Sequence, residues 1–220
     1  MSQALVAQRK SKPAGPTDRQ VNAITQEDSK LLKLLFEKNA HRLNKWLNNA
    51  QNLRIQIIYT QVSRDRRNRA FVQHHTWGLD TLEYLYPASI IKLPVVALAL
   101  ENMHELQDQY PALNAFTCFR SGTTHPCHVG TEWHEKSKRD GCVTLAHCIK
   151  DILIGSGNIS FDRLYEFLGQ EKLHEMLRKK GFTRTNVVER YGHKCSSEAN
   201  KVTNPMTFYD TEGVIYRQPA

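Results

Sequence analysis

Residues 84–103 constrain the fold most strongly, because they form the most apolar run in the chain. The run reads Tyr-Leu-Tyr-Pro-Ala-Ser-Ile-Ile-Lys-Leu-Pro-Val-Val-Ala-Leu-Ala-Leu-Glu-Asn-Met, and its apolar side chains leave no polar stripe. A helix that is apolar all round is a buried helix, so we predict a central helix over residues 88–103. A chain of 220 residues is long enough to bury such a helix in a full core.

Two polar residues, Ser89 and Lys92, stand three positions apart at the start of this predicted helix. Residues at i and i+3 of a helix are neighbours on one face. Burial disfavours the charged form of an amine and lowers its pKa, and a neutral amine can take the proton of a nearby hydroxyl. The start of a helix also presents N–H groups that suit a developing oxyanion. The pair therefore indicates an activated serine nucleophile, although Ser-x-x-Lys alone is a weak motif.

A second polar element, Ser156-Gly157-Asn158, lies between two segments with helical spacing, residues 143–154 and 160–168. A loop at this place can direct a hydroxyl and an amide into a cleft. The alternative interpretation is a turn that only ends one helix and starts the next.

The rest of the chain predicts an α+β protein. Hydrophobic spacing indicates further helices over residues 28–49 and 170–180. Residues 53–62 and 70–77 have the pattern of two strands joined by a turn, and residues 206–216 that of a hairpin turning at 210–213. Residues 1–27 are polar and are expected to form a flexible leader, whereas residues 104–142 are expected to form loops and short helices.

The order of these motifs resembles the penicillin-recognising serine hydrolases, most closely the class A β-lactamases. That family is marked by S-x-x-K, S-D-N and K-T-G. Here the nucleophile segment runs from Tyr86 to Pro94, and Thr203-Asn204-Pro205 resembles the end of the family's omega loop. The resemblance covers roughly residues 28–205 and implies a helical bundle packed against an antiparallel sheet. It therefore implies a β-lactamase-like catalytic domain over residues 28–220, after the leader.

The resemblance also implies a role for each matching residue. Ser89 would be the acylated nucleophile and Lys92 its base, while Ser156 would relay a proton to the leaving nitrogen. Asn158 would bind the amide side chain of the substrate, and Glu189 would activate the water that hydrolyses the acyl-enzyme. The implied substrate is a β-lactam or a D-alanyl amide of the cell wall, with no cofactor and no metal.

Three departures from the family pattern leave alternatives open. Gly157 replaces the Asp of the second motif, no Leu-Asn follows Glu189, and neither Lys-Thr-Gly nor Lys-Ser-Gly occurs. We expect the chain to be a piece of a longer protein whose Lys-Thr-Gly strand lies further on. The alternatives are a penicillin-binding protein of the carboxypeptidase or transpeptidase type with slow deacylation, and a non-catalytic binding or scaffold protein of the same fold.

The formal charge of +8, from 30 basic and 22 acidic residues, leaves the choice of partner open. Part of the excess is one predicted turn with four arginines, namely Arg64, Arg66, Arg67 and Arg69. No nucleic-acid-binding motif accompanies them, so we predict a solvated turn. The resemblance implies a small-molecule substrate, and we expect a monomer. The apolar runs are too short to span a bilayer. The family implies a periplasmic or secreted protein linked to antibiotic resistance, although no signal peptide is visible at the N-terminus.

The chain has five cysteines, which is an odd number, and it has no Cys-x-x-Cys motif. Both observations argue against a disulfide framework. Cys118 and Cys127 bracket a loop and could pair in an oxidising compartment. A zinc site built from Cys118, His125, Cys127 and His128 is the other possibility, but the spacing of these residues matches no standard site. We therefore predict no metal.

Overall fold

A computed structural model describes residues 20–21, 24–130 and 141–220. The backbone divides into two compact units, Met1–Leu85 and Tyr86–Ala220, and each is described by itself below. Most of the predicted leader lies outside the described residues, as does Asp140.

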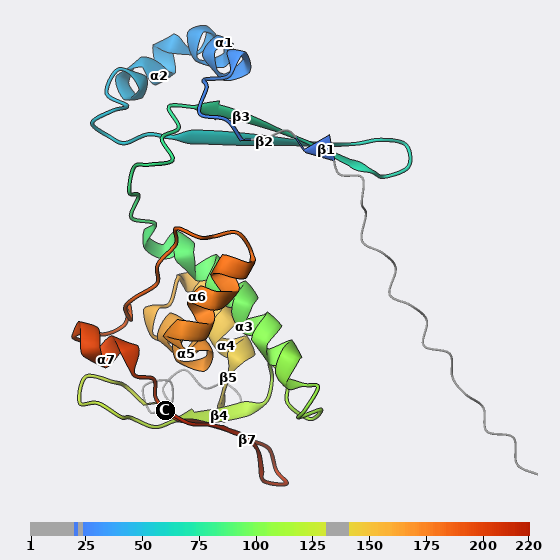
Figure 1. Cartoon of the computed structure of the whole chain (residues 1–220), viewed down its shortest axis with the longest axis vertical. Coiled ribbons are helices and arrows are strands. Elements are labelled where there is room, and N and C mark those ends of the chain that lie inside the picture. The colour runs from blue at the N-terminus through green and yellow to red at the C-terminus, as the bar shows by residue number, and fades with distance from the viewer. Residues whose placement is uncertain (1–19, 22–23, 131–140) are drawn as a thin grey trace, which may run out of the picture. The chain divides into compact units, whose positions relative to one another are not determined.

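The N-terminal unit combines two helices with a three-stranded sheet. The helices are α1 (Lys30–Lys38) and α2 (Ala40–Leu47), and the strands are β1 (Gln20–Val21), β2 (Ile57–Arg64) and β3 (Ala70–Trp77). The strand order is β1-β3-β2, with β2 and β3 antiparallel and β1 parallel to β3. The helices lie over one face of this sheet, where Phe36 meets Trp77 edge to face with the ring centroids 5.2 Å apart (Figure 1).

The single helix predicted over residues 28–49 is interrupted at Asn39. This residue leaves helical geometry at φ −113° and ψ 21°, and its side-chain nitrogen donates to the carbonyl oxygen of Leu35 at 2.7 Å. The predicted start is confirmed, because the hydroxyl of Ser29 accepts from the backbone N–H of Leu32. Strand β2 begins four residues later than predicted, since Arg54 takes a left-handed conformation with φ 51° in the preceding turn.

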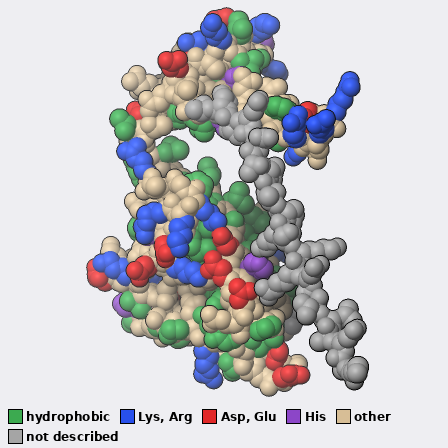
Figure 2. Space-filling view, turned by 45° about the vertical axis from the view of Figure 1, so that its right-hand side comes forward, with side chains coloured by type: hydrophobic (Ala, Val, Ile, Leu, Met, Phe, Trp, Pro, Cys, Tyr) green, Lys and Arg blue, Asp and Glu red, His purple; other side chains and the backbone are tan. Residues whose placement is uncertain are grey.

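The arginine-rich turn between β2 and β3 is exposed, as predicted. Asp65 organises it by accepting hydrogen bonds from the backbone N–H groups of Arg67 and Arg69, both at 2.9 Å. Figure 2 shows basic side chains gathered at the tip of this hairpin. The exposed arginines are Arg64, Arg66, Arg67 and Arg69.

The C-terminal unit packs helices on one face of a four-stranded antiparallel sheet (Figure 1). Its helices are η1 (Ala88–Ile91, a 3-10 turn), α3 (Lys92–Leu106), α4 (Leu145–Gly155), α5 (Asn158–Leu168), α6 (Gln170–Lys179) and α7 (Ser197–Lys201). The sheet has the order β5-β4-β6-β7, with β5 (Val143–Thr144), β4 (Cys118–Ser121), β6 (Met206–Tyr209) and β7 (Val214–Gln218). The C-terminal hairpin and its turn at residues 210–213 are confirmed, whereas β4 was not foreseen.

Helix α5 is the centre of this unit, because every residue from Ser160 to Leu168 is buried. The helix predicted over residues 88–103, which the structure divides into η1 and α3, was expected to be buried all round, and this is wrong for part of it. Val95, Ala99 and Met103 belong to the core, but Ile90 and Leu93 are 76% and 63% exposed. One side of the segment around Ser89 and Lys92 is therefore open.

One buried carboxylate joins α5 to the irregular segment before β6. Glu166 accepts from Arg163 at 2.7 Å and from Arg190 at 3.1 Å, and its side chain is 1% exposed. The side chain of Asn204 donates to the same carboxylate at 2.9 Å. A buried charge is costly unless it is paired and hydrogen-bonded, so this network fixes where residues 190–204 lie against α5.

The cysteine prediction is wrong, because four of the five cysteines form two disulfides. Cys118 pairs with Cys142, and Cys127 pairs with Cys195, with Cα–Cα distances of 5.7 and 5.8 Å. Antiparallel pairing of β4 with β5 sets Cys118 opposite Thr144, which brings Cys142 within reach. Cys118 and Cys127 therefore do not bond to each other, and the zinc set that included Cys118 is not formed. Cys148 is free and buried.

The α+β class predicted from the sequence is confirmed. Among the helices in the described part of the chain, none has the length and apolar character needed to cross a membrane.

Candidate active site

Ser89 and Lys92 occupy the junction between η1 and α3 rather than one continuous helix. Ser89 lies in the 3-10 turn, and Lys92 is the first residue of α3. The two residues are three positions apart at this junction, and Ser89 is exposed whereas Lys92 is buried. Ala88, directly before the serine, holds a left-handed conformation with φ 47°. Such strained backbone is common at functional sites.

Lys92 is buried and joins α3 to the turn between α4 and α5. Its side chain is 2% exposed, and its amine donates to the carbonyl oxygen of Ser156 at 2.5 Å and to Oδ1 of Asn158 at 2.6 Å. The hydroxyl oxygen of Ser156 lies 3.2 Å from the same nitrogen. Three of the four residues predicted to flank the nucleophile thus meet at one point.

The surroundings of Lys92 lower the pKa of its amine. Burial lowers its pKa below the ordinary 10.5, while the carboxylates of Asp162 and Asp151 act in the opposite direction and are outweighed. In its neutral form the amine would keep two N–H groups for the neighbouring oxygen atoms and would gain a lone pair, which can accept a hydroxyl proton. The structure contains no hydrogen bond between the hydroxyl of Ser89 and this amine. Such contacts often tighten only when substrate binds.

Ser156 and Asn158 are directed toward Lys92 by the way α4 ends. Ser156 follows the last residue of α4 in a left-handed conformation, with φ 55° and ψ 36°, and Asn158 begins α5. Because the side-chain oxygen of Asn158 accepts from Lys92, its NH₂ group is the donor left for a substrate carbonyl.

The glycine at the middle of the second motif has a steric explanation. A Cβ atom on Gly157 would lie 1.7 Å from Oδ2 of Asp151 and 2.6 Å from its Cγ. That carboxylate accepts from the hydroxyl of Ser160 at 2.6 Å, which holds it in the space that a side chain at position 157 would need. Asp151 was not singled out from the sequence, because its place relative to Gly157 depends on the turn.

A third carboxylate, Asp162, supports the site from the core. It is 3% exposed and accepts from the backbone N–H groups of Tyr191 and Gly192 at 2.7 and 3.0 Å. Burial, aided by the charge of Glu166, raises the pKa of Asp162 to about 7. The ring of Tyr191 stacks on Phe161 and lies 5.8 Å from the Lys92 nitrogen, measured to the ring centroid. Asp162 therefore holds an aromatic wall beside Lys92.

Asp162 and Tyr191 were missed by the sequence reasoning, although one signal was present. Asp162 stands among the apolar residues of a helix, where a carboxylate needs a dedicated partner.

Glu189, the predicted activator of water, is exposed. The structure contains no hydrogen bond or ion pair between its carboxylate and Lys92 or Ser156.

Comparison with known families identifies the class of protein that carries this site. The family model described as the β-lactamase enzyme family (Beta-lactamase2) matches residues 38–211, which is most of the chain. The chain therefore belongs to the β-lactamase enzyme family, and this membership indicates a hydrolase. No curated protein and no solved structure matched the chain.

We predict that Gly157→Ala destabilises the protein by about 1–3 kcal/mol, because the new methyl group displaces the Asp151 carboxylate from Ser160. Urea unfolding measures the change. Gly155→Ala is the matched control, since its Cβ would lie 3.5 Å from the nearest Asp151 oxygen, an ordinary contact. In the Asp151→Ala background the Gly157→Ala effect should shrink. An equal effect in both backgrounds would contradict this explanation.

We predict that Asp162 makes the folded protein less stable as the pH rises. Its pKa lies at about 7 in the folded protein against an ordinary 3.8, so the folded state holds a proton that the unfolded chain has already released. The contribution to stability is complete below the lower value and is lost as the pH rises through the upper one.

Asp162→Asn should flatten this part of the pH profile, measured as unfolding free energy by urea titration at about pH 4 to 8. Asp108→Asn, at an exposed position, is the control for loss of a surface carboxylate. An unchanged profile in Asp162→Asn would show that Asp162 does not titrate in this range.

Proposed function

We propose that the protein is a serine hydrolase that forms an acyl-enzyme at Ser89 with a β-lactam or a related D-alanyl amide. The observation that carries the proposal is the buried amine of Lys92, which has a lowered pKa and contacts both Ser156 and Asn158. A buried lysine is costly unless it is paired or neutral, and here a serine lies three residues away in the sequence.

In this proposal Lys92 takes the proton of the Ser89 hydroxyl while its oxygen bonds to the substrate carbonyl carbon. The backbone N–H of Ser89 supplies half of the oxyanion hole. The carbon–nitrogen bond then breaks, and the leaving nitrogen receives a proton through Ser156, whose hydroxyl is within 3.2 Å of Lys92. Water hydrolyses the resulting ester and restores Ser89. Asn158 donates to a carbonyl of the substrate during these steps.

A second candidate is a penicillin-binding protein of the carboxypeptidase or transpeptidase type, in which the acyl-enzyme persists. It is favoured by the position of Glu189, which is exposed and not bonded to the Lys92–Ser156 pair, while the wall next to Lys92 is the ring of Tyr191. Both candidates require the same acylation at Ser89 and differ only in the speed of hydrolysis. Both substrates place the protein in the periplasm or outside the cell, where a β-lactamase would protect against antibiotics.

We predict that incubation with penicillin adds one penicilloyl group to the intact protein, seen by mass spectrometry, and that Ser89→Ala abolishes the adduct. Lys92→Met should slow acylation by about 10²–10⁴-fold, because the general base is lost. Ser63→Ala, on strand β2, is the matched serine control and should acylate normally. Full labelling of Ser89→Ala would contradict the assigned nucleophile, and no labelling of any form would favour the non-catalytic alternative.

The lifetime of the adduct separates the two enzymatic candidates in the same experiment. Turnover of a chromogenic cephalosporin with loss of the adduct indicates a β-lactamase, and a persistent adduct indicates the penicillin-binding type. If Glu189 activates the deacylating water, Glu189→Gln prolongs the adduct without slowing its formation. An unchanged lifetime would remove Glu189 from the site.

A further inference from the structure

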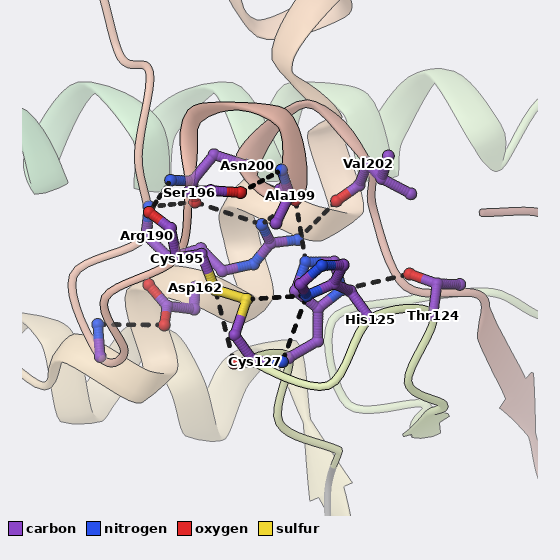
Figure 3. The surroundings of a disulfide bond; sticks show 12 residues. Thr124, His125, Cys127, Asp162, Arg190, Cys195, Ser196, Ala199, Asn200 and Val202 are labelled. Carbon is purple, nitrogen blue, oxygen red and sulfur yellow. Dashed lines mark hydrogen bonds between the residues drawn. A yellow bond between two sulfur atoms is a disulfide. The ribbon is translucent and has the colours of Figure 1, made fainter.

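Two sulfur atoms and two imidazoles meet in the C-terminal unit at a place that the acylation chemistry does not use. The loop that carries His125, Cys127 and His128 lies against the segment that carries Cys195 (Figure 3). The Cys127–Cys195 disulfide joins the two, and Nδ1 of His125 lies 3.2 Å from Sγ of Cys127. His125, Cys127 and His128 each offer one potential metal-ligand atom, and these three atoms all lie within 4.8 Å of one another.

We propose that this cluster is a redox-controlled zinc site. In the disulfide form it holds no metal, and in the reduced form Cys127, Cys195 and His125 bind one Zn²⁺ ion. Thiolate and imidazole are the ligands that zinc prefers in proteins, and a free sulfur pair beside an imidazole supplies three of them. The fourth position is taken by water.

The distances needed for zinc are close to those already present. Tetrahedral zinc with Zn–S of about 2.3 Å sets its two sulfurs about 3.8 Å apart, and sets sulfur and nitrogen about 3.5 Å apart. Reduction frees the two sulfurs to separate to this spacing, and the contact from Nδ1 of His125 to Sγ of Cys127, at 3.2 Å, is already close to the value needed.

His128 is not needed as a ligand, because both of its ring nitrogens already have partners. Its Nδ1 lies 2.8 Å from Oδ1 of Asn204, and its Nε2 lies 2.8 Å from the carbonyl oxygen of Ala199. These contacts fix the loop on the buried side of the cluster. His125 is exposed, which leaves a path for the metal and for the water ligand.

The chemical change is balanced by a dithiol reductant. Reduction adds two electrons and two protons to the Cys127–Cys195 bond, giving two thiols, while the dithiol becomes its own cyclic disulfide. The two thiols release their protons when they bind Zn²⁺. A small-molecule disulfide reverses the process by accepting the two electrons, and the metal is released as the protein disulfide forms.

The physical consequence is that the two segments can stay joined in both redox states. The disulfide ties the loop at residues 122–130 to the segment that continues into α7 and Asn204. In the reduced protein a zinc ion between the same sulfurs replaces that covalent tie. Metal binding would therefore stabilise the reduced protein and leave the oxidised protein unaffected.

The test is titration of the full-length protein with Co²⁺, a spectroscopic substitute for zinc, before and after reduction with a dithiol that is then removed without air. We expect one Co²⁺ per reduced chain, with thiolate-to-metal charge-transfer absorption and tetrahedral bands that excess Zn²⁺ removes. The oxidised protein should show neither band. Oxidised glutathione added to the cobalt form should bleach both bands as the disulfide returns.

His125→Ala is the decisive variant, because this residue is exposed and its loss should not unfold the protein. It should weaken Co²⁺ binding by about tenfold or more, whereas His104→Ala, an exposed histidine on α3, should bind as the unchanged protein does. Cys195→Ser should weaken Co²⁺ binding and reduce the thiolate band, because only one of the two sulfurs remains. Binding that is unchanged in Cys195→Ser, that is insensitive to His125→Ala, or that is equal in the oxidised protein would overturn the proposal. Failure of the reduced protein to bind Co²⁺ would do the same.

Discussion

The burial of one amine, Lys92, is the constraint on which the rest of the candidate site depends. Its nitrogen binds the carbonyl oxygen of Ser156 and the side chain of Asn158, and so ties the start of α3 to the turn between α4 and α5. The same burial lowers the pKa of the amine, against the opposing charges of Asp162 and Asp151. The burial of Lys92 therefore both joins α3 to the turn between α4 and α5 and supports the proposed role of the amine as a base.

Three carboxylates maintain that arrangement from different directions. Asp151 occupies the space beside Gly157 and fixes the turn, while Asp162 anchors the backbone at Tyr191, whose ring lies next to Lys92. Glu166 pairs with Arg163 and Arg190 and holds the following segment against α5. Two of these carboxylates, Asp162 and Glu166, lie on the buried helix α5, and their contacts explain why charged residues occur there. As Asp162 ionises near neutral pH, its charge raises the pKa of Lys92, so the two groups are linked.

The sequence predicted what depends on local patterns and missed what depends on contacts between distant residues. Helical spacing predicted α4, α5 and α6, and strand patterns predicted β2, β3 and the final hairpin. The family resemblance implied one site for Lys92, Ser156 and Asn158, and the structure brings these three side chains into contact. The disulfide partners could not be predicted, because Cys127 and Cys195 are 68 residues apart and meet only through the packed fold. The role of Gly157 was equally hidden, since it depends on where the Asp151 side chain lies.

The central claim, that burial lowers the pKa of Lys92 and so favours its role as the base for Ser89, is tested most directly by NMR titration of its side-chain nitrogen. Protein labelled with ¹⁵N-lysine would be titrated, and the Lys92 signal would be assigned by its loss in Lys92→Met. The account predicts a pKa for Lys92 below the ordinary lysine value of 10.5, and below those of the exposed lysines measured in the same spectra. A pKa at or above 10.5 would mean that Lys92 is a bound ammonium ion and would contradict its role as the base for Ser89.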